Sequence, residues 1–264
     1  MKKIMSIIMS FLMILAFSSI AMASDVDFDI NRIEQGQVVY EQNEITDEDQ
    51  LYERAQNGIS DIPLEQLQNP QINFTPVQEN KAKSLLPDPK TESNATAQII
   101  SQRILDDGTI VDEVVVTQFT DIYLPKESVI QPCLIYEDPS WDDTSSVRLT
   151  GTLTFYKATH SGVTEFYLLS KVAGRWDIVS DNPTVSNRLI VAYCCGQSDL
   201  DYLLHQEDSY YPGTNSFSYV TGFTHYVYKH AGSMGFNAKA TLKRGTSSWT
   251  MDVGCFLFGN YHLW

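Results

Sequence analysis

Strict alternation of apolar and polar residues is the feature that most restricts what this chain can fold into. Between residues 146 and 156, Val147, Leu149, Leu153 and Phe155 occupy one phase, while arginine and threonine dominate the other. Successive side chains of a strand point to opposite faces, so this period of two predicts a half-buried β-strand. Similar runs predict further strands at residues 98–105, 109–119, 164–172, 185–193, 216–228, 236–243 and 249–257.

Turn signals separate these runs. Asp106-Asp107-Gly108 predicts a tight hairpin turn, and Ala173-Gly174 is expected to end the strand of residues 164–172. Residues 231–235 are expected to form a hairpin loop. Because short strands follow one another without a helical pattern, residues 96–264 are predicted to form an all-β domain, an antiparallel two-sheet β-sandwich of the Ig-like kind. A single barrel is the alternative.

The first 23 residues have the layout of a secretory signal peptide. Lys2 and Lys3 precede an apolar run from Ile4 to Ile20, and small residues stand at Ala21 and Ala23. The alternative, a membrane anchor, is disfavoured because the run is short and no basic cluster follows it. The sequence therefore predicts cleavage near Ala23 and a product that is secreted, extracellular or associated with the cell surface.

Residues 24–95 form an acidic segment of different character. From Ser24 to Ser93 it holds 15 acidic and five basic residues and few aromatic ones. Such a composition buries little apolar surface, so this segment is predicted to be a mostly unstructured linker, with propeptide and surface tether as open alternatives. One short helix is expected at residues 47–56, capped by Thr46 and ended by Gly58.

Net charge restricts the classes of partner. The chain has 18 basic and 33 acidic residues, and loss of Lys2 and Lys3 leaves 16 against 33, a formal charge of −17. A surface of this sign repels nucleic acid and anionic lipid headgroups. A neutral glycan, a cell-wall component or an extracellular protein is the expected partner, and no cofactor is predicted.

Four cysteines, Cys133, Cys194, Cys195 and Cys255, allow three full pairings in an oxidising compartment. If Leu189 and Val191 face inward, Cys195 continues their phase and becomes the first choice of partner for Cys255. Cys194 would then pair with Cys133. The alternative is that these residues are reduced and pack as small apolar side chains. No pair of cysteines has redox-motif spacing, so a nucleophilic cysteine is not predicted.

The motifs "RLTGTLTFY", "SKVAGRWDIV", "VSNRLIVAY" and "LKRGTSSWTMDV" follow one another in this order. In this order they resemble small secreted β-sandwich proteins of Gram-positive bacteria that have no described activity. The resemblance implies a compact, mostly Ig-like extracellular domain, and it supplies no catalytic residues.

The sequence patterns that resemble catalytic or metal sites have simpler interpretations. Ser233 has the spacing of a hydrolase nucleophile, but a strand rather than a helix is predicted after it. The five histidines are scattered, and Glu137, Asp138, Asp142 and Asp143 are expected to form a solvated acidic loop without calcium-site spacing. No catalytic residue and no metal ligand is therefore predicted.

A tyrosine-rich segment supplies the candidate ligand contacts, because exposed tyrosine rings can hold sugars or interfacial lipid. Phe217, Tyr219 and Phe223 share one phase and are predicted to be core. The residues predicted to contact a ligand are Tyr210, Tyr211, Tyr226 and Tyr228. The sequence thus favours a secreted, non-enzymatic β-sandwich protein that binds an extracellular or cell-envelope component. The alternatives are a membrane-binding or toxin-like β-sandwich protein and an unrecognised hydrolase.

Overall fold

The computed structural model describes residues 30–63, 67, 70–77, 87–126, 140–160, 162, 164–180, 183–198 and 202–259. Most of these residues lie in strands, and all the pairings between the strands are antiparallel, which confirms the predicted all-β class. The predicted signal peptide of residues 1–23 and Cys133 lie outside the described residues.

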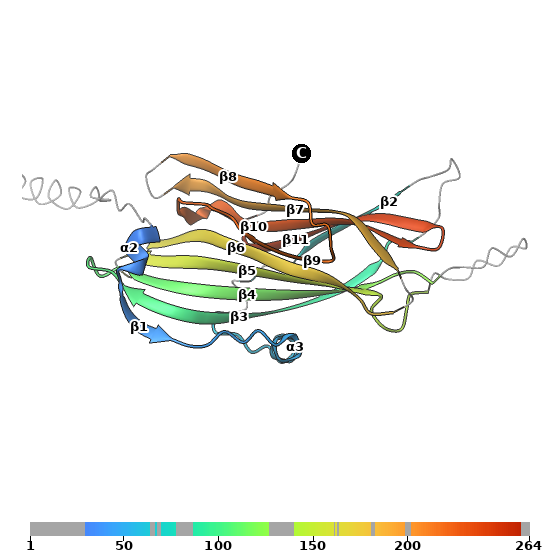
Figure 1. Ribbon diagram of the computed structural model, residues 1–264, viewed down its shortest axis with the longest axis horizontal. Coiled ribbons are helices and arrows are strands. Elements are labelled where there is room, and N and C mark those ends of the chain that lie inside the picture. The colour runs from blue at the N-terminus through green and yellow to red at the C-terminus, as the bar shows by residue number, and fades with distance from the viewer. Residues whose placement is uncertain are drawn as a thin grey trace, which may run out of the picture.

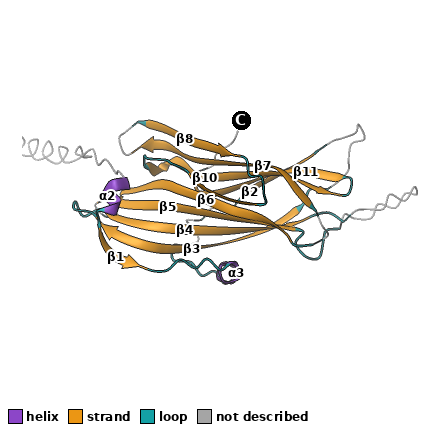
Figure 2. Ribbon diagram, viewed as in Figure 1, coloured by secondary structure: helices purple, strands orange, loops and turns teal. Residues whose placement is uncertain are grey.

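The strands form two layers that are hydrogen-bonded into one sheet (Figure 1). The strands of the first layer are β1 (Gln37–Glu41), β3 (Lys90–Ile104), β4 (Ile110–Tyr123), β5 (Val147–His160), β6 (Thr164–Ile178) and β9 (Ser216–Val220). The strands of the second layer are β8 (Leu203–Tyr210), β7 (Thr184–Ser198), β10 (Val227–Arg244), β11 (Ser247–Phe258) and β2 (Gln71–Pro76). The layers join where Val227 and Tyr228 of β10 pair with β6. Two short helices, α2 (Ile30–Glu34) and α3 (Glu48–Gln56), lie outside these layers (Figure 2).

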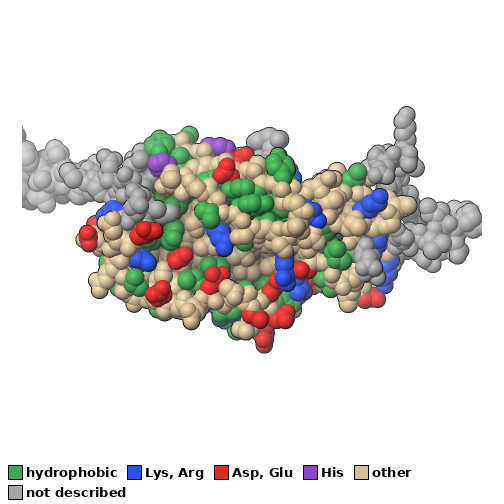
Figure 3. Space-filling view, viewed as in Figure 1, with side chains coloured by type: hydrophobic (Ala, Val, Ile, Leu, Met, Phe, Trp, Pro, Cys, Tyr) green, Lys and Arg blue, Asp and Glu red, His purple; other side chains and the backbone are tan. Residues whose placement is uncertain are grey.

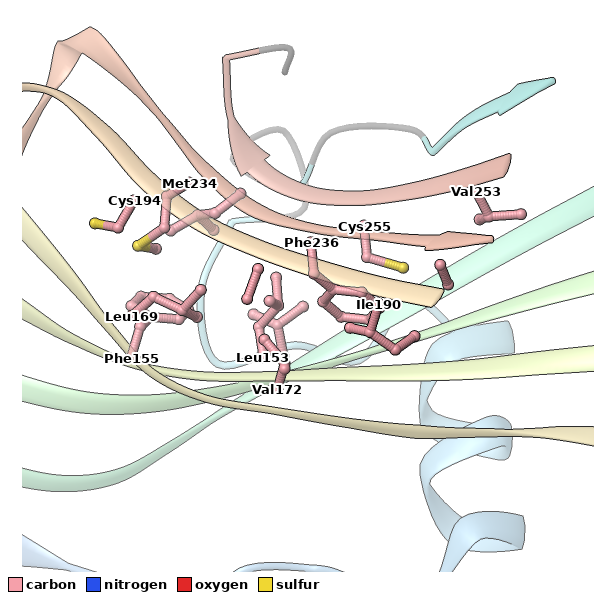
Figure 4. Packing of buried hydrophobic residues seen from close by; sticks show 14 of the residues in the cluster. Leu153, Phe155, Leu169, Val172, Ile190, Cys194, Met234, Phe236, Val253 and Cys255 are labelled. Atoms are coloured by element: carbon pink, nitrogen blue, oxygen red, sulfur yellow. The ribbon is translucent and has the colours of Figure 1, made fainter. Parts of the chain in front are cut away.

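The core lies between the layers. Leu153, Phe155, Leu169 and Val172 point from the first layer toward Ile190, Phe236 and Val253 of the second (Figure 4). The contact is close at Gly151 on β5, where a Cβ atom would lie 2.9 Å from both the Sγ of Cys255 and the Cζ of Phe236. A glycine opposite larger side chains therefore lets the two layers pack closely.

Strand β6 does not end at Ala173-Gly174, as the sequence predicts, but runs through to Ile178. Gly174 is needed for a close approach. A Cβ there would stand 2.2 Å from the carbonyl oxygen of Thr150 and 2.8 Å from the ring of Phe217 on β9. Glycine in a strand often marks such an approach rather than a strand end.

Strand boundaries also differ from the prediction between residues 216 and 243. The run of residues 216–228 is divided into β9 and the start of β10. The predicted loop at residues 231–235 lies inside β10, where the register of its pairing with β7 shifts between Val227 and Gly232. From the sequence, the glycines near this position predict a turn. In the structure they lie within an irregular strand.

The facing of β7 is the opposite of the predicted one. Asn187 has a positive φ of 50°, and the pairing with β10 shifts register between Lys239 and Thr241. An extra residue in a strand exchanges its two faces beyond the bulge. Ile190, Ala192 and Cys194 therefore belong to the core, and Leu189 and Val191 lie on the other face.

The acidic segment is more ordered than predicted. Strand β1 pairs with β3 at the edge of the first layer, and β2 pairs with β11 at the edge of the second. The expected helix is present as α3, although Asp47 rather than Thr46 caps it by accepting a hydrogen bond from the Gln50 nitrogen at 2.9 Å. The strands of this segment extend the edges of the sheet, so the segment needs little apolar surface of its own.

Helix α3 lies against the outer face of the first layer. Leu51 and Ala55 are buried against Phe119, and the rings of Tyr52 and Phe119 meet edge to face at 5.1 Å. The Tyr52 hydroxyl donates to Asp121 at 2.9 Å, and the Arg148 guanidinium donates two hydrogen bonds to the same carboxylate. A small apolar contact and a charged network together hold this helix. Within the described residues, none of the helices has the length and apolar character needed to cross a membrane.

Candidate functional site

An aromatic stack connects β8 of the second layer with β9 of the first layer. The rings of Tyr210 at the end of β8 and Tyr219 on β9 are parallel within 5°, with centroids 4.1 Å apart. Each of these strands pairs with a different layer, β8 with β7 and β9 with β6. Side-chain stacking therefore contributes to the link between these strands.

The stack continues inward as a row of aromatic rings. Tyr219 is followed by Phe217, whose ring lies 6.3 Å away and is tilted by 18°. Phe217 contacts Trp176 at 5.4 Å and Phe236 at 5.9 Å, and both of these side chains are fully buried. Because packed cores hold their side chains in fixed rotamers, this row mounts the stack rigidly.

The hydroxyl group of Tyr210, at the surface end of the stack, is held in its neutral form. It lies 3.3 Å from an Asp208 oxygen and 3.4 Å from the Val220 carbonyl, both acceptors. Burial and the Asp208 carboxylate raise the pKa of Tyr210 to about 12. The hydroxyl is therefore a donor throughout the neutral pH range.

Two exposed apolar side chains follow directly on the stacked tyrosines. Tyr211 is 76% exposed and Val220 is 75% exposed. We call the stacked residues Tyr210 and Tyr219, together with the exposed residues Tyr211 and Val220 that follow them in the chain, the aromatic platform. Hydrophobic side chains gather around β7, β9 and β10 on the face drawn in Figure 3.

The loop that carries Tyr211 is tied to both layers. The Asn215 carbonyl accepts a hydrogen bond from the backbone nitrogen of Trp176 on β6 at 2.9 Å. The Asn215 side chain accepts from Arg188 on β7. Thr214 donates to the Ser216 carbonyl at 2.9 Å, and Pro212 is buried. Tyr211 thus projects from a fixed loop, which limits the entropy lost when a ligand binds.

The structure brings together two of the four predicted ligand-contact tyrosines. Tyr210 and Tyr211 belong to the platform. Tyr226 is fully buried, which corrects the prediction that it contacts a ligand. Tyr228 packs on Phe166, with ring centroids 4.4 Å apart. Tyr219, predicted to be core, is half-buried and belongs to the stack. Val220 was missed, and its place after Tyr219 in a period-two run is the signal that could have found it.

The described cysteines are free, which overturns the predicted Cys195–Cys255 bond. Cys194 and Cys255 lie in the core (Figure 4). Cys195 lies on the opposite face of the second layer, because the bulge at Asn187 exchanges the faces of β7. Burial raises the pKa of the Cys194 and Cys255 thiols to about 12. Both behave as small apolar core residues, the alternative considered from the sequence.

The other sequence candidates have structural explanations. Ser233 lies within strand β10 and pairs with Cys195, so it is not on the strand-to-helix turn that a hydrolase nucleophile needs. The sequence predicts a solvated loop around Asp142. In the structure Asp142 is instead buried and paired with Arg244 and Ser146. Among the described residues, no three His, Cys, Asp or Glu side chains are placed to hold a metal ion.

Comparison of the chain with protein-family models, curated proteins and solved structures found no match. The resemblance to secreted β-sandwich proteins of Gram-positive bacteria stays a prediction.

Proposed function

We propose that this chain is a secreted, non-enzymatic binding protein that holds a neutral polysaccharide of the cell envelope or its surroundings on the aromatic platform. The observation that carries the proposal is the pair of exposed side chains, Tyr211 at 76% and Val220 at 75%, that directly follow the stacked residues Tyr210 and Tyr219 in the chain. Exposed apolar side chains on a rigid frame mark binding surfaces more often than isolated ones do.

The chemistry of the platform suits sugar rings. A sugar presents an apolar face of C–H groups that packs on a tyrosine ring, and hydroxyls at its rim that need hydrogen-bond partners. The Asp208 carboxylate, which lies within hydrogen-bond distance of the Tyr210 hydroxyl, supplies oxygen atoms at the platform. A mature charge of −17, from 16 basic and 33 acidic residues, favours a neutral polymer over an anionic one.

The test is a binding survey of the full mature chain on insoluble chitin, cellulose and peptidoglycan, followed by titration with soluble oligosaccharides. Tyr211→Ala is expected to weaken binding at least tenfold, because it removes the most exposed ring of the platform. Tyr40→Ala is the matched control, since Tyr40 is 44% exposed on β1 in the other part of the first layer. The control is expected to bind as the parent does.

Two outcomes would overturn the proposal. One is that no neutral polysaccharide is bound by the parent chain. The other is that Tyr211→Ala and Tyr40→Ala bind equally well. Co-sedimentation with vesicles of neutral and anionic lipid serves as the arm for the membrane-binding alternative. Vesicle binding that depends on Tyr211, without polysaccharide binding, would replace this proposal by that alternative.

A further inference from the structure

Cys195 and His205 face each other across strands β7 and β8. The register makes them direct partners, and the Cys195 Sγ lies 3.4 Å from the His205 Nδ1. Both are on the outer face of the second layer, whereas Cys194 points into the core. This pair is separate from the aromatic platform, to which β8 contributes Tyr210.

A carboxylate fixes the tautomer of this histidine. The Nε2 of His205 lies 3.3 Å from an oxygen of Glu207, which follows two residues later on the same strand face. An ionised carboxylate only accepts hydrogen bonds, so the geometry assigns the ring proton to Nε2. The lone pair of Nδ1 then faces the thiol.

The three residues form the order of groups that activates a thiol: nucleophile, base and a group that orients the base. Burial raises the pKa of the Cys195 thiol and the Glu207 carboxylate adds to this, while backbone hydrogen bonds at Gln206 and Cys194 oppose them. Free thiolate is therefore scarce near neutral pH. A base in contact with the sulfur is what such a thiol needs in order to react.

Access distinguishes Cys195 from the other described cysteines. Its side chain is half-buried, and the His205 side chain beside it is 61% exposed. Cys194 is 0% exposed and Cys255 is 2% exposed. A small reagent thus reaches one described thiol while the fold is intact.

We propose that Cys195 is a reactive thiol that forms mixed disulfides with small disulfide molecules, with His205 as the base and Glu207 as the residue that positions it. The Cys195 proton passes to Nδ1 as the sulfur attacks one sulfur of the disulfide. A new S–S bond forms, the old one breaks, and the departing thiolate takes the proton from the imidazolium. Cys195 is oxidised and half of the disulfide is reduced, so no further reagent is needed.

The proposal goes beyond polysaccharide binding and does not depend on it. An exported protein meets the oxidising surroundings in which disulfides are the available co-reactants. The modified face is the outer face of the second layer, so modification at Cys195 leaves the core in place.

The experiment follows the reaction of the full mature chain with 4,4′-dithiodipyridine, a neutral disulfide that the protein's charge does not repel. A Cys133→Ser background removes the cysteine outside the described residues, and peptide mapping locates the label. We expect Cys195 to be labelled first, and Cys194 and Cys255 only after unfolding. His205→Ala is expected to slow labelling at pH 7 at least tenfold, and added imidazole to restore part of the rate.

Further variants separate activation from altered packing. His160→Ala, on β5 of the first layer, is the matched histidine control and is expected to react at the parent rate. His205→Gln keeps a polar side chain of similar size and serves if the alanine variant does not fold, as judged by near-ultraviolet circular dichroism. Glu207→Gln is expected to slow the reaction in the parent background, because Glu207 positions the base. In the His205→Ala background it is expected not to slow the reaction, since the only remaining action of the carboxylate is to raise the pKa of the Cys195 thiol.

Three results would overturn the proposal. In the first, the folded His205 variants react as fast as the parent. In the second, Cys194 or Cys255 is labelled at the same rate as Cys195. In the third, imidazole fails to accelerate a slowed His205→Ala variant, which would leave the histidine with a packing role.

Discussion

The two sides of this sandwich are held by different physical means. On the β3–β4 side, α3 lies on the outer face through Leu51, Ala55 and a charged network around Asp121. On the β8–β9 side, the layers are joined by the parallel rings of Tyr210 and Tyr219 and the row of rings behind them. The first contact combines a small apolar area with ionised groups that are largely withdrawn from water. The second depends on apolar area and leaves part of that area open to a ligand.

The largest effect is expected at Phe217, where the aromatic row meets the core. Phe217→Ala removes a ring that is 6% exposed and contacts Trp176, Phe236 and Tyr219. A cavity of this kind costs about 3–5 kcal/mol of unfolding free energy. Urea unfolding of the parent and the variant measures the loss. Tyr211→Ala is the control, because an exposed ring of the same segment is expected to change stability by about 0.5 kcal/mol or less.

A loss below about 1 kcal/mol in Phe217→Ala would contradict the comparison. It would mean that the aromatic row adds little to the attachment of β9. The platform would then not be rigid, and the entropic advantage claimed for its binding site would disappear.

The second prediction concerns the charged network under α3. Asp121→Ala leaves the Arg148 guanidinium and the Tyr52 hydroxyl without the acceptor that both use. The Asp121 side chain is 6% exposed, and loss of one partner of a largely buried pair is expected to cost about 2–3 kcal/mol. Thermal unfolding checks this, together with loss of the Tyr52–Phe119 contact by near-ultraviolet circular dichroism.

Asp177→Ala provides the matched control on the same face. Asp177 also pairs with an arginine, but its side chain is 34% exposed and that of Arg175 is 48% exposed. Exposed pairs contribute little, so a change of about 0–0.5 kcal/mol is expected. Equal losses in the two variants would show that burial does not set the strength of this network.

The same contrast explains what the sequence could predict. Alternation around Leu149 and Phe155 identified β5, and Asp106-Asp107-Gly108 identified the β3–β4 turn, because both signals are local. Composition missed β1 and β2, since an edge strand gains its hydrogen bonds from a distant neighbour. The bulge at Asn187 also has no strong local signal. It exchanged the faces of β7 and made the predicted Cys195–Cys255 bond impossible.

The candidate site was predictable to the extent that it follows sequence neighbours. Tyr210 and Tyr211 were found because tyrosines cluster there, and Tyr226 was chosen for the same reason although it is buried. The stacking of Tyr210 on Tyr219 joins strands of different layers, and the pairing of Cys195 with His205 depends on the β7–β8 register. Neither is visible without the topology.

The smallest effect is expected at the Tyr210 hydroxyl, and its sign changes with pH. Tyr210→Phe keeps the stacked ring and removes the hydrogen bond, so at pH 7 the variant is expected to lose about 0.5–1 kcal/mol. The pKa of Tyr210 is raised to about 12 by burial and Asp208, whereas in the unfolded chain it is close to 10. The stability that the neutral hydroxyl contributes is complete below about pH 10 and is lost as the pH rises toward 12, because the unfolded chain then releases the proton first.

The phenylalanine variant has no such proton to lose. Its urea midpoint is therefore expected to fall less steeply between pH 9.5 and pH 11, and to approach or cross that of the parent. Parallel pH profiles would show that the Tyr210 hydroxyl is as hydrated as in the unfolded chain. The stack would then be held by its rings alone.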